Sequence, residues 1–191
     1  MDVSERDTLH RYLHAGRDAL RWKLDGLDEL DARRPLTPTG LNLLGLVRHV
    51  AICAADYFGV TFGRPCPEPT PDVDTDPHAD FVTPPEVSLR EALAQVDRWW
   101  EHADRTITEL APDARGRVPW WSGERAEVTL QQVLVHMTAE THRHAGHADV
   151  LRERLDGLAG LRPGSTNLPD GVDWPAHVAR VEAAARAAAD R

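Results

Sequence analysis

The chain has 191 residues, and 41% of them are hydrophobic, which is enough for one domain with a core and too little for two. A formal net charge of −9, without any cluster of Lys and Arg, argues against nucleic-acid binding, because phosphate neutralisation needs such a cluster. No apolar run approaches the roughly 20 residues that cross a bilayer, and the polar start MDVSERDTLHRY is unlike a signal peptide. We therefore expect a cytoplasmic protein of one domain that does not enter a membrane.

Two helices are predicted in the N-terminal part of the chain. The first spans Val3 to Leu30, is opened by Ser4 or Asp7, and carries leucines at helical spacing. The stretch ARRPLTPTG, dense in Pro and Gly, ends it. The second spans Leu41 to Val60 and is apolar nearly all round, which is typical of the most buried helix in a bundle.

A proline-rich connection separates the second helix from the third. The segment Thr61 to Val87 contains seven prolines, which excludes a helix or a central strand. A four-helix bundle uses a connection of this length when consecutive helices run parallel and the chain must travel back along the bundle. Ser88 then opens the third helix, with Glu91 completing a capping box, and Pro112 stops it.

The next segment, Asp113 to Val128, is predicted to be a loop. Its two tryptophans, Trp120 and Trp121, stand where a plain linker would be polar. They either plug one end of the bundle or wall a ligand pocket, since aromatic walls are typical of small-ligand sites.

The fourth helix is predicted from Leu130 to Leu155, with Thr129 as its N-cap. A short Ala-rich helix follows, from Pro175 to about Ala189. No strand pattern is visible anywhere in the chain. The sequence therefore predicts an all-α fold: a four-helix bundle with a long crossover between helices two and three and a short C-terminal helix.

Two polar residues, Glu140 and His144, interrupt the apolar face of the fourth helix. They are four residues apart, so their side chains project from adjacent turns toward one point, as the ligands of helical HExxH motifs do. A carboxylate in a core costs several kcal/mol when unpaired, and a cation bound by both groups would neutralise it. The alternative is a hydrogen-bonded core pair without any metal.

The second helix supplies a third candidate ligand, His49. A lone histidine on an apolar helix is more often a satisfied core residue than a ligand, but beside Glu140 and His144 it completes a set of two nitrogens and one oxygen. Such a set is typical of catalytic zinc, because it leaves a position open for water or substrate.

Three further residues are candidates for the surroundings of this site. Cys53 lies one helical turn after His49, although a small buried hydrophobe is its simpler interpretation. His136 and His147 lie at the edge of the arc and are expected to be dispensable for metal binding. His142 points to the opposite face and is expected to be a solvated surface residue. The two cysteines, Cys53 and Cys66, form no spacing motif, so a disulfide framework is not expected.

The motifs GLVRHV in the second helix and LVHMTAETHRHAGHADVLRERLDG in the fourth, with the PWW loop between, resemble the DinB/YfiT-like superfamily of metalloenzymes, in its actinobacterial branch. The resemblance covers roughly residues 5–157 and leaves 158–191 as a C-terminal extension. It implies an up-down-down-up bundle with a metal triad at His49, Glu140 and His144. Many members have histidine where this chain has Glu140; glutamate occurs in the mycothiol-dependent maleylpyruvate isomerase relatives. Zinc is the expected metal, and nickel is an alternative.

The resemblance also implies a thiol-linked activity. Characterised relatives use a low-molecular-weight thiol, mycothiol in actinobacteria, for S-transfer or isomerisation on a small electrophile. A divalent cation deprotonates a coordinating thiol, or it lowers the pKa of bound water to about 7 for hydrolysis. Three interpretations stay open: a mycothiol-dependent transferase or isomerase, another metal-dependent hydrolase, and a non-catalytic metal-binding or stress-response protein. A homodimer is also compatible with the sequence.

Overall fold

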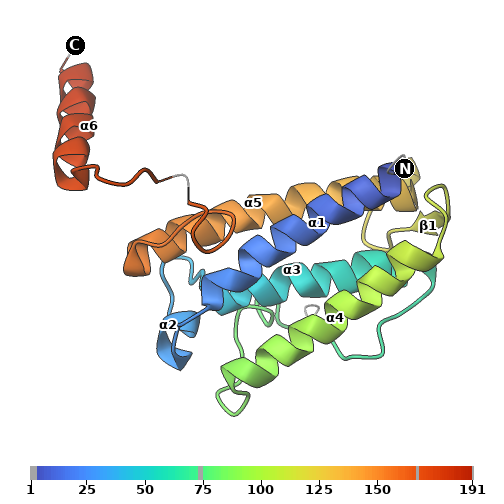
Figure 1. Cartoon of the computed structure of the whole chain (residues 1–191). Helices are drawn as coiled ribbons and strands as arrows, with labels where there is room; N and C mark the ends of the chain where they lie inside the picture. Colours follow the sequence, from blue (N-terminus) through green and yellow to red (C-terminus); the bar gives the residue numbers. More distant parts are fainter. Residues whose placement is uncertain (1–3, 73–74, 167, 191) are drawn as a thin grey trace.

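Long helices lying side by side make up the body of the protein. The computed structural model describes residues 4–72, 75–166 and 168–190. Its long helices are α1 (Glu5–Arg21), α3 (Leu43–Phe58), α4 (Leu89–Glu109) and α5 (Leu130–Asp156), which pack into one bundle (Figure 1). The expected all-α class is confirmed, because only a small two-stranded sheet accompanies the helices.

The first helix is shorter than the sequence analysis predicts. Ser4 is the N-cap, and its hydroxyl accepts a hydrogen bond from the Asp7 backbone N–H; the predicted start at Val3 lies outside the described residues. The predicted end at Leu30 is wrong. The chain leaves α1 through a 3-10 turn (Trp22–Leu24), and Gly26 then adopts a left-handed conformation with φ 76°. Because this conformation breaks a helix, a separate short helix, α2 (Glu29–Arg33), follows.

The most buried helix is α3, as predicted. Its N-cap is Asn42, whose side-chain oxygen accepts a hydrogen bond from the Gly45 N–H. The window Leu43–Phe62 is long and apolar enough to cross a membrane by length and composition, contrary to the sequence expectation, but 72% of it is buried inside the protein. That burial is what the core helix of a bundle requires.

Capping boxes open both α4 and α5. Ser88 and Glu91 cap α4 reciprocally, as predicted from the sequence. Thr129 and Gln132 do the same for α5, and Gly157 ends that helix in a left-handed conformation with φ 81°. The predicted bounds of the fourth helix are therefore correct to one residue.

Contacts at both ends of α1 show that it runs in the same direction as α5. Near its start, the Gln131 amide donates to the Glu5 carboxylate at 3.2 Å. Beyond its end, the buried Lys23 ammonium lies 3.0 Å from the Asp149 carboxylate. Small residues allow close packing between these points, since a Cβ added at Gly16 would lie 2.9 Å from the Thr141 methyl group.

A short antiparallel sheet, which the sequence analysis did not predict, shapes the loop before α5. Strand β1 (Arg115–Arg117) pairs with β2 (Glu127–Thr129). Three-residue strands are too short to show the alternation by which strands are recognised, so the expectation of no strand was wrong. This sheet holds the intervening loop, which carries the two tryptophans, against the end of the bundle.

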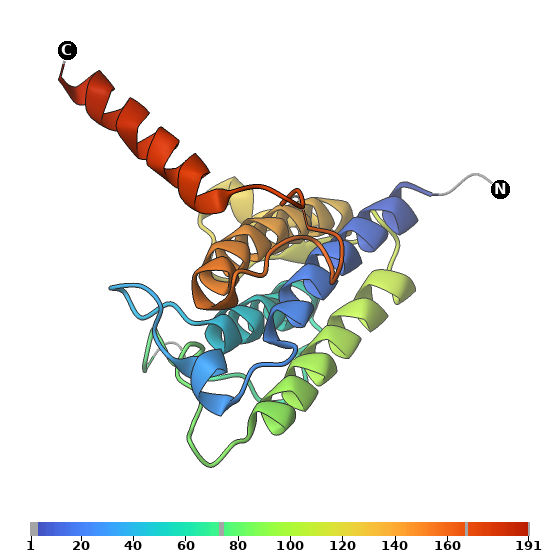
Figure 2. The same cartoon turned by 60° about the vertical axis from the view of Figure 1, so that its left-hand side comes forward.

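The C-terminal helix α6 (Trp174–Ala189) stands apart from the bundle (Figures 1 and 2). Asp173 is its N-cap, and Pro175 lies in its first turn, close to the predicted start. None of its described residues is buried. Helix α6 therefore contributes no buried residue to the core.

Candidate functional site

A cavity of about 290 Å³ lies between α3 and α5. Each helix contributes four of the lining residues, and these include apolar side chains as well as imidazole, thiol and carboxylate groups. The residues are His49, Val50, Cys53, Tyr57, His136, Met137, Glu140 and His144. The structure thus brings His49, Glu140, His144, Cys53 and His136 to one place.

His49 is held by a buried carboxylate. Its Nδ1 lies 2.5 Å from Oδ2 of Asp80, which is only 5% exposed, and the Phe81 ring stacks on the imidazole at 5.4 Å. The hydrogen bond with Asp80 raises the pKa of His49 to about 10, assisted by the neighbouring Cys53 and opposed by burial. With Nδ1 engaged, Nε2 faces the cavity, 3.8 Å from the Cys53 sulfur. This orientation is the one in which Nε2 serves as a ligand and Nδ1 is fixed by an outer partner.

Sequence reasoning missed Asp80, because it lies in the segment interpreted as a plain connection. Asp80 is 31 positions from His49, and no helical spacing relates the two. The available signal was local: an acidic residue directly before the apolar pair Phe81 and Val82, in a loop that is otherwise polar or proline-rich. Phe81 packs against the core, and so it brings the neighbouring carboxylate inside.

His144 and Glu140 face His49 from α5. The His144 and His49 rings are 5.1 Å apart between centroids, and His144 Nε2 lies 3.8 Å from Glu140 Oε2. Burial, together with the nearby His49 and His147, lowers the pKa of His144 to about 4. Its Nδ1 is buried and has no hydrogen-bond partner among the described residues. The ring is therefore neutral at pH 7, with a nitrogen lone pair available.

Glu140 is not in the core, and in this respect the sequence analysis was wrong. Its side chain is 38% exposed, at the rim of the cavity. The apolar face of α5 was assigned correctly for its apolar residues. At Glu140, however, this face borders the cavity instead of a neighbouring helix. Partial solvation removes much of the penalty expected for a buried carboxylate.

The other histidines of α5 differ in their surroundings. His136 lines the cavity, whereas His147 is exposed and touches only the edge of the site, with its ring 5.4 Å from that of His144. His142 is not a free surface residue as expected: it is half-buried, and its Nε2 lies 3.0 Å from the Tyr12 carbonyl oxygen on α1. It therefore helps to join α1 to α5.

Aromatic side chains stand beside the cavity. The Trp121 ring lies 5.3 Å from His136 and 5.8 Å from Tyr57, two residues that line the cavity. Trp120 packs edge-on against Tyr57 at 5.0 Å and donates its indole N–H to the Tyr57 hydroxyl at 3.3 Å. Trp120 stays 50% exposed. Both tryptophans thus contact the wall of the cavity from outside.

A second cluster of potential metal ligands lies between α1 and α4. Ligand atoms of His10, His14 and Asp104 are all within 4.8 Å of one another, and such a group can hold a metal ion. Within the described residues, His49, Glu140 and His144 do not form so tight a group. The sequence analysis overlooked this cluster, although the spacing of four between His10 and His14 was visible.

This chain is a DinB-like protein: its helical bundle presents a histidine from α3 and a Glu-x-x-x-His pair from α5 to one cavity. Within this class, the chain belongs to the mycothiol S-transferase family, whose family model matches residues 8–157. The match ends where α5 ends, so it covers the bundle and leaves out α6. No curated protein and no solved structure matches the chain.

Proposed function

We propose that the protein is a metal-dependent mycothiol S-transferase or isomerase that joins the thiol to a small electrophile in the cavity between α3 and α5. The observation that carries the proposal is this cavity, which in a member of the mycothiol S-transferase family is lined by three histidines, a glutamate and a cysteine. We place the activity in the bundle, in one cytoplasmic domain, with 158–191 as an extension.

The residues present fit a divalent cation, most favourably Zn²⁺, with Ni²⁺ as the alternative. His49, Glu140 and His144 would hold it through two imidazole nitrogens and one carboxylate oxygen, a donor set common to catalytic zinc sites. Two features support this fit: Asp80 leaves Nε2 of His49 facing the cavity, and the neutral His144 ring has a buried nitrogen that finds no hydrogen-bond partner among the described residues. When bound, the cation supplies the positive charge that keeps a thiol deprotonated at neutral pH.

The chain's own residues then select and orient the reactants. Asp80 holds the His49 ring, and Tyr57 with Trp121 forms an apolar wall that excludes water from one side of the cavity. A volume of about 290 Å³ is at the small end of ligand sites. A cavity of this size suits the thiol end of mycothiol and a small electrophile, so the sugar part of the thiol must lie outside it. The exposed Trp120, which packs against the lining residue Tyr57, is the candidate contact for this part.

The test is thioether formation by purified protein, freed of metal by chelation and then reloaded with Zn²⁺. With mycothiol and a fluorogenic haloalkyl electrophile, we expect turnover that requires both the metal and the thiol. His49→Ala and His144→Ala should lower the rate at least about 100-fold, because each removes one of three ligands. His177→Ala, which changes a histidine on α6 outside the bundle, is the matched control and should leave the rate unchanged. Turnover by chelated protein, or full activity in His144→Ala, would refute the proposal.

A further inference from the structure

A polar seam joins α1 to α4, and the two helices run in opposite directions along it. Arg6, at the start of α1, donates to the Thr108 carbonyl oxygen near the end of α4. Arg21, at the end of α1, pairs with the Asp97 carboxylate at 3.1 Å. Between these two contacts the seam is held by charged and imidazole side chains, with a cavity of about 260 Å³ beside them.

Two histidines of α1 converge on one carboxylate oxygen at the middle of the seam. His10 Nε2 lies 2.8 Å and His14 Nε2 lies 3.5 Å from the same Oδ1 of Asp104. The side chains are between 17% and 35% exposed, so solvent reaches them without surrounding them. One turn of helix between two histidines and an oxygen ligand from a neighbouring helix is a geometry that binds first-row transition metals.

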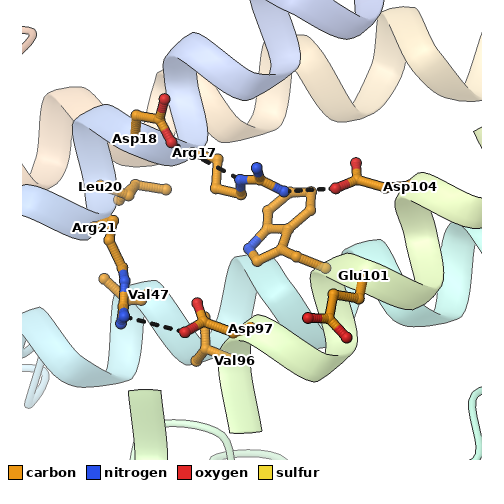
Figure 3. Close-up of a pocket in the computed structure, with 10 residues that line it drawn as sticks. Arg17, Asp18, Leu20, Arg21, Val47, Val96, Asp97, Glu101 and Asp104 are labelled. Carbon is orange, nitrogen blue, oxygen red and sulfur yellow. Dashed lines mark hydrogen bonds and ion pairs between the residues drawn. The ribbon is translucent and has the colours of Figure 1, made fainter. Parts of the chain in front are cut away.

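Arg17 occupies part of this cluster in the described structure. One of its terminal nitrogens lies 2.9 Å from Asp104 Oδ2 (Figure 3). The other lies 2.5 Å from His14 Nδ1. Because a guanidinium only donates, His14 Nδ1 must accept, which places the ring proton on Nε2. That proton blocks the nitrogen that faces Asp104. The same residues therefore cannot hold Arg17 in this position and a cation at the same time.

We propose that His10, His14 and Asp104 form a second divalent-cation site, for Zn²⁺, Ni²⁺ or Co²⁺, and that Arg17 competes with the cation for it. Binding at Nε2 of both histidines requires the His14 proton to move to Nδ1, which Arg17 must first leave. The seam cavity receives the displaced guanidinium: it is lined by Asp18, Asp97 and Glu101, and Asp18 Oδ1 already lies 3.9 Å from Arg17 Nε (Figure 3).

This second site lies between α1 and α4, apart from the cavity between α3 and α5, and its existence does not depend on the proposed function. A cation here joins α1 to α4 directly, where the described contacts include hydrogen bonds, ion pairs and the cation–π contact of Arg17 with Trp100. Since the unfolded chain does not bring His14 and Asp104 together, the cation binds the folded state and must raise its stability.

The experiment is a titration of the metal-free full chain with Co²⁺ and Zn²⁺, following heat and the visible spectrum of Co²⁺. We expect one ion per chain at His10, His14 and Asp104, and a second ion where the site between α3 and α5 also binds the metal. A double variant, His49→Ala with His144→Ala, should leave one ion, and its Co²⁺ spectrum should disappear when His14→Ala is added. His177→Ala is the control. Asp104→Asn, which keeps the size of the side chain, replaces His14→Ala if that variant does not fold.

Arg17→Met tests the competition. It keeps an unbranched side chain of similar length and removes the guanidinium, whose carbon lies 5.3 Å from the centroid of the Trp100 ring. We expect the remaining site of the double variant to bind Co²⁺ at least about 10-fold more tightly after this change. If the double variant binds no ion, or if His14→Ala leaves its Co²⁺ spectrum intact, the site does not exist. If Arg17→Met binds no more tightly than its parent, Arg17 is not a competitor.

Discussion

Asp80 is the residue of the site that the sequence analysis did not predict, and it sets the orientation of His49. It is buried, its Oδ2 lies 2.5 Å from His49 Nδ1, and its Oδ1 has no hydrogen-bond partner among the described residues. Its near neighbour Arg48 is also buried, and burial lowers the Arg48 pKa while the charge of Asp80 raises it. The carboxylate therefore balances a buried cation and fixes the orientation of an imidazole.

Replacing Asp80 by Asn should weaken metal binding without removing any ligand. The amide keeps the size of the side chain but is a poorer acceptor for the His49 N–H, and loss of such an outer partner typically costs about 10- to 100-fold in metal affinity. Competition against a chromophoric chelator measures this directly. Glu86→Gln, at an exposed position of the same loop, is the matched control and should bind as the wild type does. An Asp80→Asn protein with unchanged affinity would show that His49 needs no such partner.

At the level of elements, local chemistry made the helices predictable. Thr129 was predicted as an N-cap and Ser88 as part of a capping box, and both open their helices in the structure. Apolar spacing predicted the buried faces of α3 and α5. The break after α1 was not predicted, because leucines continue at helical spacing through the segment in which Gly26 turns the chain. The structure resolves this conflict by tertiary contacts: Arg152 of α5 donates to the carbonyl oxygens of Lys23 and Asp25, which an uninterrupted helix would use internally.

Arg152 is held in turn by Asp156, through two contacts of 2.8 and 2.7 Å with the carboxylate. The contribution of Asp156 to the stability of the fold should therefore depend on pH. Burial raises the pKa of Asp156, but hydrogen bonds from Arg152 and the Leu158 N–H outweigh it, so the pKa is below the usual value. The ionised carboxylate therefore contributes stability above its unfolded pKa of about 4, and this contribution disappears as the pH falls through the lower folded pKa.

Asp156→Asn should accordingly lower the free energy of unfolding at pH 7, by about 1 kcal/mol for loss of a charged hydrogen bond at a partly solvated position. The difference from the wild type should shrink as the pH is lowered from 5 to 3. Urea unfolding at several pH values, with a chelator present, measures this change. Asp170→Asn, at an exposed residue, should show no such trend. A difference that stays constant down to pH 3 would contradict the assignment.

For the whole molecule, the sequence predicted the class of fold and the elements that carry the site more completely than the site itself. Periodicity placed His49, Glu140 and His144 on helices that share a core, and the structure brings them to one cavity. Periodicity could not supply Asp80 or Asp104, because each approaches its histidine from another element. It also could not tell that Glu140 lies at a rim, since the position of a cavity depends on the packing of two helices together.

Helix α6 should be dispensable for the bundle. None of its residues is buried, although Trp174, Val178 and Val181 form an exposed apolar stripe. A chain ending after Gly171 should unfold within about 0.5 kcal/mol of the full chain, as expected for changes confined to the surface. Thermal melts and light scattering of both chains test this. Fewer chains per particle, or a lower melting temperature, after truncation would mean that α6 packs against another copy.

The connection between α3 and α4 has a consequence for anyone who edits this protein. Surface connections usually tolerate insertion, deletion and transfer, because little depends on their sequence. Here the loop places Asp80 against the imidazole of His49 on the preceding helix, α3. If only α3 and α5 were transferred to another bundle, the pocket would lack the hydrogen bond between Asp80 and His49. The loop must be moved with the helices, and loop-shortening libraries should keep Asp80 and Phe81 fixed.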